Sequence, residues 1–376
     1  MMKNRIGIIG GGQLGRMMAF DAKKLGFHVT IVDPTPNGPA GQVVDEQIVA
    51  PYNDEAAIRK LAEKSDFLTF EIELANADIL NELAENGLEI HPSAKTLSTI
   101  KDKLQQKIFL KEKALPVADF IEVNDKVEIE QAGKTFGYPF LLKARFDAYD
   151  GRGNALINEK AVIEKGIEKL HGRKLYVEKF VPFVKELTVV VARSTKGEIK
   201  TYPVVETIHK NNICHIVKAP ASIDEAIKQK AESLAIRTME QLQGAGVFAI
   251  EMFLTKNGDV IINEIAPRVH NSGHFTIEAC VTSQFEQHIR AVTGLPLGET
   301  NMILPAAVMI NILGERNGAV EITGLDQVLK IPNVAIHIYG KMETKIERKM
   351  GHITVIGKTI DECLEKAEKA RKLVTI

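Results

Sequence analysis

Apolar runs and amphipathic segments alternate along residues 5–92. Strand-length runs of Ile, Val, Leu and Phe lie at 6–9, 29–32 and 67–70, and segments with helical spacing of apolar residues lie at 55–64 and 76–85. Such alternation is typical of a parallel sheet whose strands are joined by crossover helices. The first part of the chain is therefore predicted to be an α/β unit.

The pattern changes after His91-Pro92-Ser93. A long charged helix is predicted over 94–113, and Leu115-Pro116 marks the start of a second unit. Between 120 and 265 the predicted strands are closer together and often form hairpins, with one clear helix over 223–242. This second unit is expected to be of the α+β class.

A small third unit is predicted after Leu295-Pro296. Three apolar runs, at 306–313, 334–339 and 353–356, precede a final helix. The three predicted domains are 1–98, 99–300 and 301–376.

Composition and charge exclude several classes of protein but do not identify an activity. The net charge of -1 and the pI near 6.8 lack the basic footprint of most proteins that bind nucleic acid or a membrane surface. The three cysteines, Cys214, Cys280 and Cys363, have neither disulfide-framework nor zinc-site spacing. No apolar stretch is long enough to span a membrane, and the first residues do not have the pattern of a signal peptide. We expect a cytoplasmic protein with no nucleic-acid or membrane partner.

The glycine-rich start has two interpretations. Gly10-Gly11-Gly12-Gln13-Leu14-Gly15 fits G-x-G-x-x-G between a strand and a helix, and Asp33 ends the next strand where a ribose-binding acid would lie. A dinucleotide-binding dehydrogenase is one hypothesis. The motif itself requires only that something approach the helix N-terminus closely, which fits a phosphate, a polar substrate or tight helix–strand packing equally.

Two predicted strands, 247–254 and 259–265, flank Asn257-Gly258, a strong hairpin signal. A two-residue turn there places Lys256 opposite Asp259 and Glu251 opposite Glu264. Opposed carboxylates among apolar neighbours repel each other unless a cation lies between them, and oxygen ligands favour magnesium or manganese. A solvated hairpin or a slipped register is the alternative. In a regular strand Asn263 points to the opposite face.

A nucleotide pocket is suggested by three further segments. Lys143 ends an apolar strand, and the stretch 149–153 is punctuated by glycines and contains an arginine, as in loops that cradle phosphates. The segment 175–182, followed by Glu186 before a predicted strand at 187–192, has the pattern of an inter-strand linker that presents backbone groups to an adenine and a carboxylate to a ribose. Each segment alone is a weak signal, so the prediction of a nucleotide pocket rests on the order of the segments along the chain.

In that order the motifs resemble those of the ATP-grasp carboxylate–amine ligases, and most closely the family of 5-(carboxyamino)imidazole ribonucleotide synthases. The resemblance covers almost the whole chain. Its motifs are the glycine-rich start, Phe70-Glu71-Ile72-Glu73, Lys143 with residues 149–153, residues 178–181, the run 263–274 (Asn-Glu-Ile-Ala-Pro-Arg-Val-His-Asn-Ser-Gly-His), Tyr339-Gly340-Lys341 and Arg348-Lys349-Met350-Gly351-His352. The resemblance implies a Rossmann-like N-terminal domain, an ATP-grasp domain and a small C-terminal domain.

The same resemblance implies the site residues. The ATP site would comprise Lys103, Lys143, Ala148, Tyr149, Asp150, Gly151, Arg152, Gly153, Asn154, Glu178, Lys179, Phe180, Val181, Glu186, His209, Asn263 and Glu264. Glu251 and Glu264 would bind magnesium, in agreement with the hairpin argument. The aminoimidazole ribonucleotide would contact Gln13, Glu73, Tyr149, Arg152, Lys341 and Arg348, whereas Arg268, His270 and Asn271 would lie near bicarbonate and the transferred phosphoryl group. Asp150 is the candidate general base. The chain departs from the family pattern at Ala148, where glycine is common, and at Lys103, where arginine is common.

The activity implied is ATP- and bicarbonate-dependent carboxylation of 5-aminoimidazole ribonucleotide in purine (IMP) biosynthesis, through carboxyphosphate, with release of ADP and phosphate. The family also suggests a homodimer. Within the same class, a formate-dependent glycinamide ribonucleotide transformylase or a biotin carboxylase stays open. From other classes, a dehydrogenase or a nucleotide-binding regulator without catalysis stays open.

Overall fold

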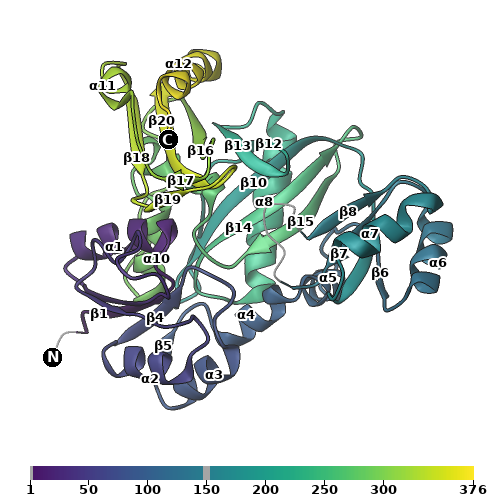
Figure 1. Cartoon of the computed structure of the whole chain (residues 1–376), viewed down its shortest axis with the longest axis horizontal. Coiled ribbons are helices and arrows are strands. Elements are labelled where there is room, and N and C mark those ends of the chain that lie inside the picture. Colours follow the sequence, from purple (N-terminus) through teal and green to yellow (C-terminus); the bar gives the residue numbers. More distant parts are fainter. Residues whose placement is uncertain (1–2, 147–152) are drawn as a thin grey trace.

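The computed structural model describes residues 3–146 and 153–376 (Figure 1). Its first unit is a parallel sheet in the order β3-β2-β1-β4-β5. The strands are β1 (Arg5–Ile9), β2 (His28–Val32), β3 (Glu46–Ile48), β4 (Phe67–Phe70) and β5 (Glu89–Ile90). On one face α1 (Gln13–Lys24) packs over Ile6 and Ile8, and on the other α2 (Glu55–Glu63) and α3 (Ala77–Glu85) pack over Ile9 and Phe70. The predicted α/β unit is confirmed.

The single helix predicted over 94–113 is wrong, because Asp102 divides it into α4 (Ala94–Lys101) and α5 (Lys103–Glu112). Asp102 has extended backbone angles, and its side chain accepts hydrogen bonds from the Leu104 and Gln105 amides. An aspartate in this position satisfies the free N–H groups that begin a helix. Asp102 also pairs with Arg145, which no local pattern could reveal.

A small antiparallel sheet follows, in the order β6-β9-β7-β8. Its strands are β6 (Phe120–Val123), β7 (Phe140–Ala144), β8 (Asn154–Ile157) and β9 (Leu175–Lys179). Together with α6 (Lys126–Phe136), η1 (Lys160–Val162) and α7 (Ile163–Lys169) it encloses its own core around Phe140 and Val177. This lobe lies at the right of Figure 1.

A second, larger sheet runs from the centre of the molecule to its C-terminal end in the order β15-β14-β10-β12-β13-β16-β20-β18, with β11 beside β10. Its strands are β10 (Phe183–Arg193), β11 (Ile199–Thr201), β12 (Val205–Lys210), β13 (Ile213–Ala219), β14 (Gly246–Thr255), β15 (Val260–Ala266), β16 (Ala306–Leu313), β18 (Val334–Ile338) and β20 (Lys349–Gly357). The pairing of β13 with β16 carries the sheet across the predicted boundary at 300/301. The division into 1–98, 99–300 and 301–376 stays a prediction.

Helices cover both faces of this sheet. On one face α8 (Glu225–Leu242) packs on Leu187, Val189 and Phe248. On the other, α10 (Gln284–Val292) packs on Val190 and also contacts α1, which joins the first unit to the large sheet.

The C-terminal part is completed by small elements around the end of the large sheet. There α12 (Ile360–Leu373) covers β16 and β20. The remaining elements are η2 (Asn271–Gly273), α9 (Thr276–Ala279), β17 (Gly318–Ala319), α11 (Leu325–Val328) and β19 (Glu343–Thr344). Among the described helices, none combines the length and apolar content that crossing a bilayer needs. The fold class expected from the sequence, α/β followed by α+β, is confirmed.

Candidate functional site

The hairpin of β14 and β15 places Glu251 directly opposite Glu264, as predicted. The turn and the strand pairing that produce this register differ from the prediction. Leu254 pairs with Val260, so the turn is one residue longer than the two-residue turn, and a bulge at Asn263 then shifts the register back by one. Because a bulge interrupts the alternation of side chains, Asn263 is not held to the opposite face as it would be in a regular strand.

Four further polar groups share the sheet face of this pair. Thr188 of β10 is the register partner of Glu251, and Glu186 lies two residues away on the same strand face. Glu186 in turn contacts His209 of β12, with 3.2 Å between its Oε2 and the imidazole Nδ1. Lys103, the first residue of α5, forms an ion pair with Glu264. One face of the sheet therefore gathers predicted ATP-site residues from three strands and a helix, together with the predicted metal ligand Glu251 on a fourth strand.

The carboxylates of Glu251 and Glu264 on this sheet face would favour binding of a cation. Burial, and then the facing charge of Glu264, raise the pKa of Glu251 to about 7. The neighbouring imidazole of His270, whose Nε2 lies 3.5 Å from Glu251 Oε1, offers no compensating charge, because burial and then Arg268 hold its pKa well below the ordinary value. Two carboxylates that repel each other in a partly buried site are a donor set that fits magnesium or manganese.

A second charged group lies in the small lobe. Glu178 of β9 is 1% exposed, and its carboxylate is shared by Lys143, at 2.6 Å, and by Lys107 of α5, at 2.7 Å. Lys143 and Glu178 were predicted from the sequence as site residues, whereas Lys107 was not. The spacing of Lys103 and Lys107, four residues apart on a predicted helix, was the available signal, because such residues share a helix face.

The segment 175–182, expected to be a linker, is mostly a strand: Leu175–Lys179 form β9, and only residues 180–182 lie between β9 and β10. The Lys179 amide donates to Asp119 O at 2.9 Å. Of the predicted phosphate loop, Gly153 is buried and its carbonyl accepts from the Ala144 amide, while Asn154 begins β8 opposite Lys143. The other predicted loop residues lie outside the described part of the chain: Ala148, Tyr149, Asp150, Gly151 and Arg152.

The glycine-rich turn is occupied by the chain's own carboxylates. Glu71, which follows β4, accepts hydrogen bonds from the amides of Gly12 and Gly15, and Asp33 accepts from the Gly11 amide at 2.7 Å. A Cβ added at Gly10 would lie 2.3 Å from Glu71 Cγ. The close approach that the motif requires is thus made by a side chain, and the groups that a dinucleotide pyrophosphate and ribose would use are already bonded.

The first unit meets the segment after β15 through Glu73. Its Oε1 lies 3.0 Å from Nε of Arg268. Burial alone would raise the pKa of Glu73, but the charges of Arg268 and Lys103 outweigh it and lower the pKa. Gln13, the first residue of α1, is partly exposed at the end of the turn that Glu71 fills. Glu73, predicted to contact the ribonucleotide, and Arg268, predicted to lie near bicarbonate, are therefore in direct contact.

His270 and Asn271 are held by polar contacts from several elements. The backbone amide of His270 donates to Gln284 Oε1 at 2.9 Å, and Nδ1 of the His270 ring lies 2.9 Å from Ser272 Oγ. Both amide atoms of Asn271 pair with Asn311 of β16, at 2.6 and 3.0 Å. These contacts direct the imidazole of His270 towards Glu251, whereas the amide of Asn271 is engaged in the sheet interior.

Lys341 and Arg348 both belong to the C-terminal part. Lys341 Nζ donates to Lys349 O at 2.5 Å, and Arg348 Nη1 donates to Glu343 O at 2.8 Å. Gly340, next to Lys341, accepts a hydrogen bond at 2.7 Å from Gln42 of the first unit. This contact places the Lys341 backbone against the unit that carries Gln13 and Glu73.

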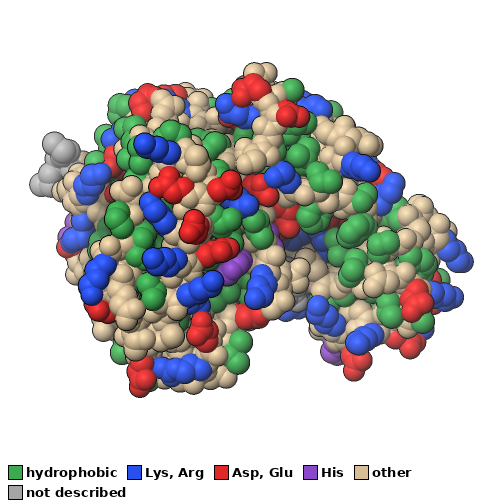
Figure 2. Space-filling model, turned by 90° about the horizontal axis from the view of Figure 1, so that it is seen from above, with side chains coloured by type: hydrophobic (Ala, Val, Ile, Leu, Met, Phe, Trp, Pro, Cys, Tyr) green, Lys and Arg blue, Asp and Glu red, His purple; other side chains and the backbone are tan. Residues whose placement is uncertain are grey.

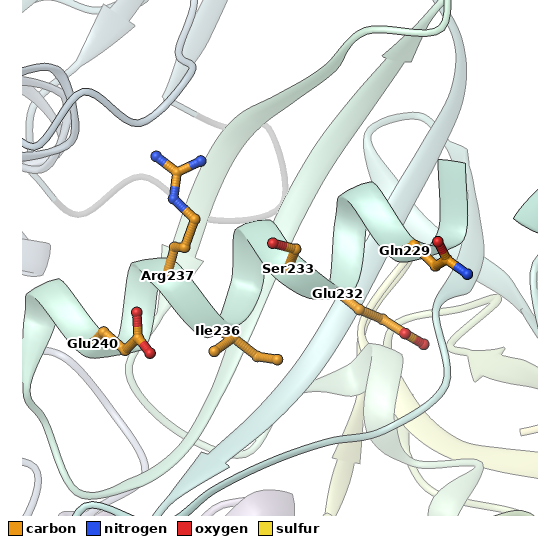
Figure 3. A pocket seen from close by; sticks show the side chains of 6 residues that line it. All are labelled: Gln229, Glu232, Ser233, Ile236, Arg237 and Glu240. Atoms are coloured by element: carbon orange, nitrogen blue, oxygen red, sulfur yellow. The ribbon is translucent and has the colours of Figure 1, made fainter. Parts of the chain in front are cut away.

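The surface agrees with a site between the units. Figure 2 shows the viewed face hollowed between the larger body and the lobe at the right, with charged side chains of both signs around the hollow. A shallow pocket on α8 lies elsewhere, on the helix that covers the opposite face of the large sheet (Figure 3). Its lining comes from that one helix: Gln229, Glu232, Ser233, Ile236, Arg237 and Glu240.

Comparison with known proteins identifies the family. Residues 1–101 match the ribonucleotide synthetase preATP-grasp domain, 108–285 the ATP-grasp domain, and 307–366 the phosphoribosylaminoimidazole carboxylase C-terminal domain. The chain is 43% identical to the N5-carboxyaminoimidazole ribonucleotide synthase of Bacillus subtilis, over 96% of this chain and 93% of that protein. The chain belongs to the N5-carboxyaminoimidazole ribonucleotide synthase family.

Two further relatives agree. The phosphoribosylaminoimidazole carboxylase of Ogataea methanolica is 44% identical over 96% of this chain, which spans 68% of that longer protein. A crystal structure of N5-carboxyaminoimidazole synthase from Aspergillus clavatus, in complex with ADP and 5-aminoimidazole ribonucleotide, is 37% identical with a TM-score of 0.91, covering 99% of this chain and 98% of that one.

Membership of the N5-carboxyaminoimidazole ribonucleotide synthase family confirms the resemblance and the Rossmann-like, ATP-grasp and C-terminal parts expected from it. It also makes the chain an ATP-dependent ligase. Together with the occupied glycine-rich turn, it excludes the dehydrogenase hypothesis.

Proposed function

We propose that the chain carboxylates 5-aminoimidazole ribonucleotide, with ATP and bicarbonate as co-substrates, in purine biosynthesis. The observation that carries the proposal is the opposed pair Glu251 and Glu264, flanked by Lys103, His209 and His270, in an ATP-grasp domain. The name of the Bacillus subtilis relative and the ligands of the Aspergillus clavatus structure support this substrate.

The reaction has two steps. A bicarbonate oxygen attacks the γ-phosphorus of ATP, the bond to the β-bridging oxygen breaks, and ADP leaves with formation of carboxyphosphate. The exocyclic amine of the ribonucleotide then forms a carbon–nitrogen bond with the carboxyl carbon, loses a proton, and releases phosphate. Asp150, outside the described residues, is the proposed acceptor of that proton.

The described residues would act by binding and orienting. Lys103 and Lys143 would bind phosphate oxygens of ATP, since point cations suit phosphates. Glu251 and Glu264 would hold magnesium or manganese, which when bound would neutralise charge on the transferred phosphoryl group. Arg268, fixed by Glu73, would present its guanidinium to bicarbonate, because a planar fork matches a carboxylate-like anion.

The remaining predicted contacts complete the proposed site. Asn263, Asn154, Gly153, Glu186 and His209 would line the nucleotide, together with residues 178–181. Gln13, Glu73, Tyr149, Arg152, Lys341 and Arg348 would contact the ribonucleotide, with His270 and Asn271 near bicarbonate. Domains 1–98, 99–300 and 301–376, a homodimer and a cytoplasmic location complete the proposal.

The dependence of ATP hydrolysis on the acid and the amine tests the function. Release of phosphate should require magnesium and bicarbonate, and should be fastest with 5-aminoimidazole ribonucleotide present. With oxygen-18 bicarbonate the label should enter the released phosphate, because a bicarbonate oxygen attacks phosphorus. Stimulation by formate and glycinamide ribonucleotide, or by biotin, would overturn the substrate, and binding of ATP without turnover under every condition would overturn catalysis itself.

A further inference from the structure

Helix α5 has two lysines, and each of them forms an ion pair with a different one of the two sheets that flank the proposed nucleotide site. Lys103 and Lys107 lie four residues apart and so share a helix face. Lys103 pairs with Glu264 on β15 of the large sheet, and Lys107 pairs with Glu178 on β9 of the small sheet. Figure 1 shows α5 at the junction between the large sheet and the small lobe. Lys107 has no part in the proposed reaction.

The group around Glu178 contains two cations and one carboxylate. Lys107 is 2% exposed and Glu178 1%, whereas Lys143 is 12% exposed. Ionised groups this deeply buried are costly unless they are paired. The single charge of Glu178 compensates one lysine, so one positive charge remains. Lys143 is the more exposed of the two, on the strand that leads to residues 147–152.

The pKa of Glu178 depends on its two lysine partners. Burial would raise the pKa of Glu178, but the charges of Lys107 and then Lys143 outweigh it and lower the pKa. Burial lowers the pKa of Lys107, and the charge of Glu178 opposes this change only in part, because Lys143 acts in the same direction as burial. Glu178 is thus an anion that would neutralise Lys143 if Lys107 were absent.

We propose that Lys107 is a positioning residue for the nucleotide: by neutralising the buried carboxylate of Glu178, it leaves the positive charge of Lys143 available to an ATP phosphate. The inference rests on the proposed function only in assigning Lys143 to ATP. Lys107 itself need not touch the nucleotide, because it acts through Glu178.

The test is a double-mutant cycle read by equilibrium binding of magnesium-ATP, measured by titration calorimetry. Lys107→Met keeps the aliphatic stem and removes the charge. The carboxylate of Glu178 should then neutralise Lys143, and the Kd for ATP should rise about ten-fold. In a Glu178→Gln background the carboxylate is absent, so adding Lys107→Met should change the Kd by less than about two-fold. Lys107→Arg, which keeps the charge, should stay within about three-fold of the parent.

A second ion-pair group provides a matched control. Glu286 of α10 is also buried and also shared by two cations, Lys24 and Arg290. Lys24→Met removes a lysine from that group, on α1 away from the small lobe, and should leave the Kd for ATP unchanged. Each variant is checked for folding by circular dichroism and thermal unfolding, and Lys107→Gln replaces Lys107→Met if the latter does not fold.

Equal weakening of ATP binding by Lys107→Met in both backgrounds would overturn the inference, because the loss would then not pass through Glu178. So would an unchanged Kd in the folded Lys107→Met or Lys107→Gln variant. Failure of the proposed function looks different: the parent protein would bind ATP and show the cycle, but bicarbonate and the ribonucleotide would not stimulate hydrolysis.

Discussion

Glu251 and Glu264 illustrate how single side chains set the electrostatics of the site. Each faces the other across a hairpin, but only Glu264 has a lysine partner, and Glu251 lies beside a neutral imidazole. His209 and Lys103 only partly oppose the effects of burial and of the Glu264 charge on the pKa of Glu251, so binding of a proton or a cation would be favourable here. The pKa of about 7 means that near neutral pH a proton and a metal ion would compete for the same carboxylate.

The first prediction concerns this carboxylate in the absence of divalent cations. The folded-state pKa of Glu251, about 7, lies above the ordinary value of 4.5, so the folded protein binds this proton more tightly than the unfolded chain. The contribution of Glu251 to stability is therefore lost as the pH rises from about 4.5 through about 7. Glu251→Gln should be more stable than the parent at pH 8 by roughly 1–3 kcal/mol, measured by urea unfolding in EDTA.

Two comparisons make this measurement decisive. At pH 4.5 the advantage of Glu251→Gln should vanish, and excess magnesium at pH 8 should reverse it, since the ion would stabilise only the intact pair. Glu343→Gln, at an exposed carboxylate, should show neither change. A stability difference that is constant with pH would contradict the raised pKa.

Some residue-scale features were accessible from the sequence and others were not. The opposition of Glu251 and Glu264 could be counted along two strands because pairing within a hairpin is local. The same count assumed too short a turn and no bulge, two errors that cancelled at Glu264. Asn263 was expected on the opposite face only if the strand were regular, and the bulge removes that condition. The role of Glu71 was not foreseen, because its bonds join residues from separate strand–helix connections.

At the scale of elements, the glycine-rich turn before α1 is shaped by an internal anion. Carboxylates are stabilised at helix N-termini by the free N–H groups and the helix dipole. Here the acceptor is the carboxyl group of Glu71, and burial raises its pKa against the opposing effect of the Gly15 and Gly12 amides. The motif predicted the strand–turn–helix geometry correctly, but a pattern of glycines does not specify which anion fills the turn.

The second prediction tests how closely Glu71 fits this turn. Gly10→Ala should lower the free energy of unfolding by about 2–4 kcal/mol, because the new Cβ would lie 2.3 Å from Glu71 Cγ at a φ of +106°. Gly26→Ala is the matched control: its φ is +83°, yet a Cβ there meets nothing within 4 Å, so only the backbone strain of about 1 kcal/mol is expected. Equal losses in urea unfolding would show that the approach of Glu71 does not matter.

Apolar periodicity located most elements because their burial is local in the sequence. Strands β1, β2, β4 and β16 follow the predicted runs closely, since parallel and central strands are buried on both faces. The helix predicted over 94–113 failed at Asp102, whose ion pair with Arg145 depends on the position of the residue that follows β7, far away in the sequence. Propensity cannot reveal a break that a tertiary ion pair stabilises.

On the scale of the whole molecule, the proposed ribonucleotide site depends on contact between parts distant in the sequence. The large sheet continues from the ATP-grasp region into the C-terminal strands, which fixes those strands relative to Glu251 and Glu264. Near Lys341 the C-terminal part contacts the first unit through Gln42. The Gln42 side chain donates a hydrogen bond to Gly340 O and accepts one from Arg16. Displacement at this point would move Lys341 relative to Gln13 and Glu73.

The last prediction tests this contact between units. Gln42→Ala should raise the KM for 5-aminoimidazole ribonucleotide about three- to ten-fold and leave the KM for ATP unchanged, because only the ribonucleotide would bridge the two units. Gln47→Ala is the matched control, since Gln47 bonds Thr35, Asn37 and Asp33 within the first unit alone. Steady-state kinetics at saturating co-substrates measure both constants. If both KM values rise together in Gln42→Ala, or if Gln47→Ala has the same effect, the change acts through the stability of the first unit and not through the position of Lys341.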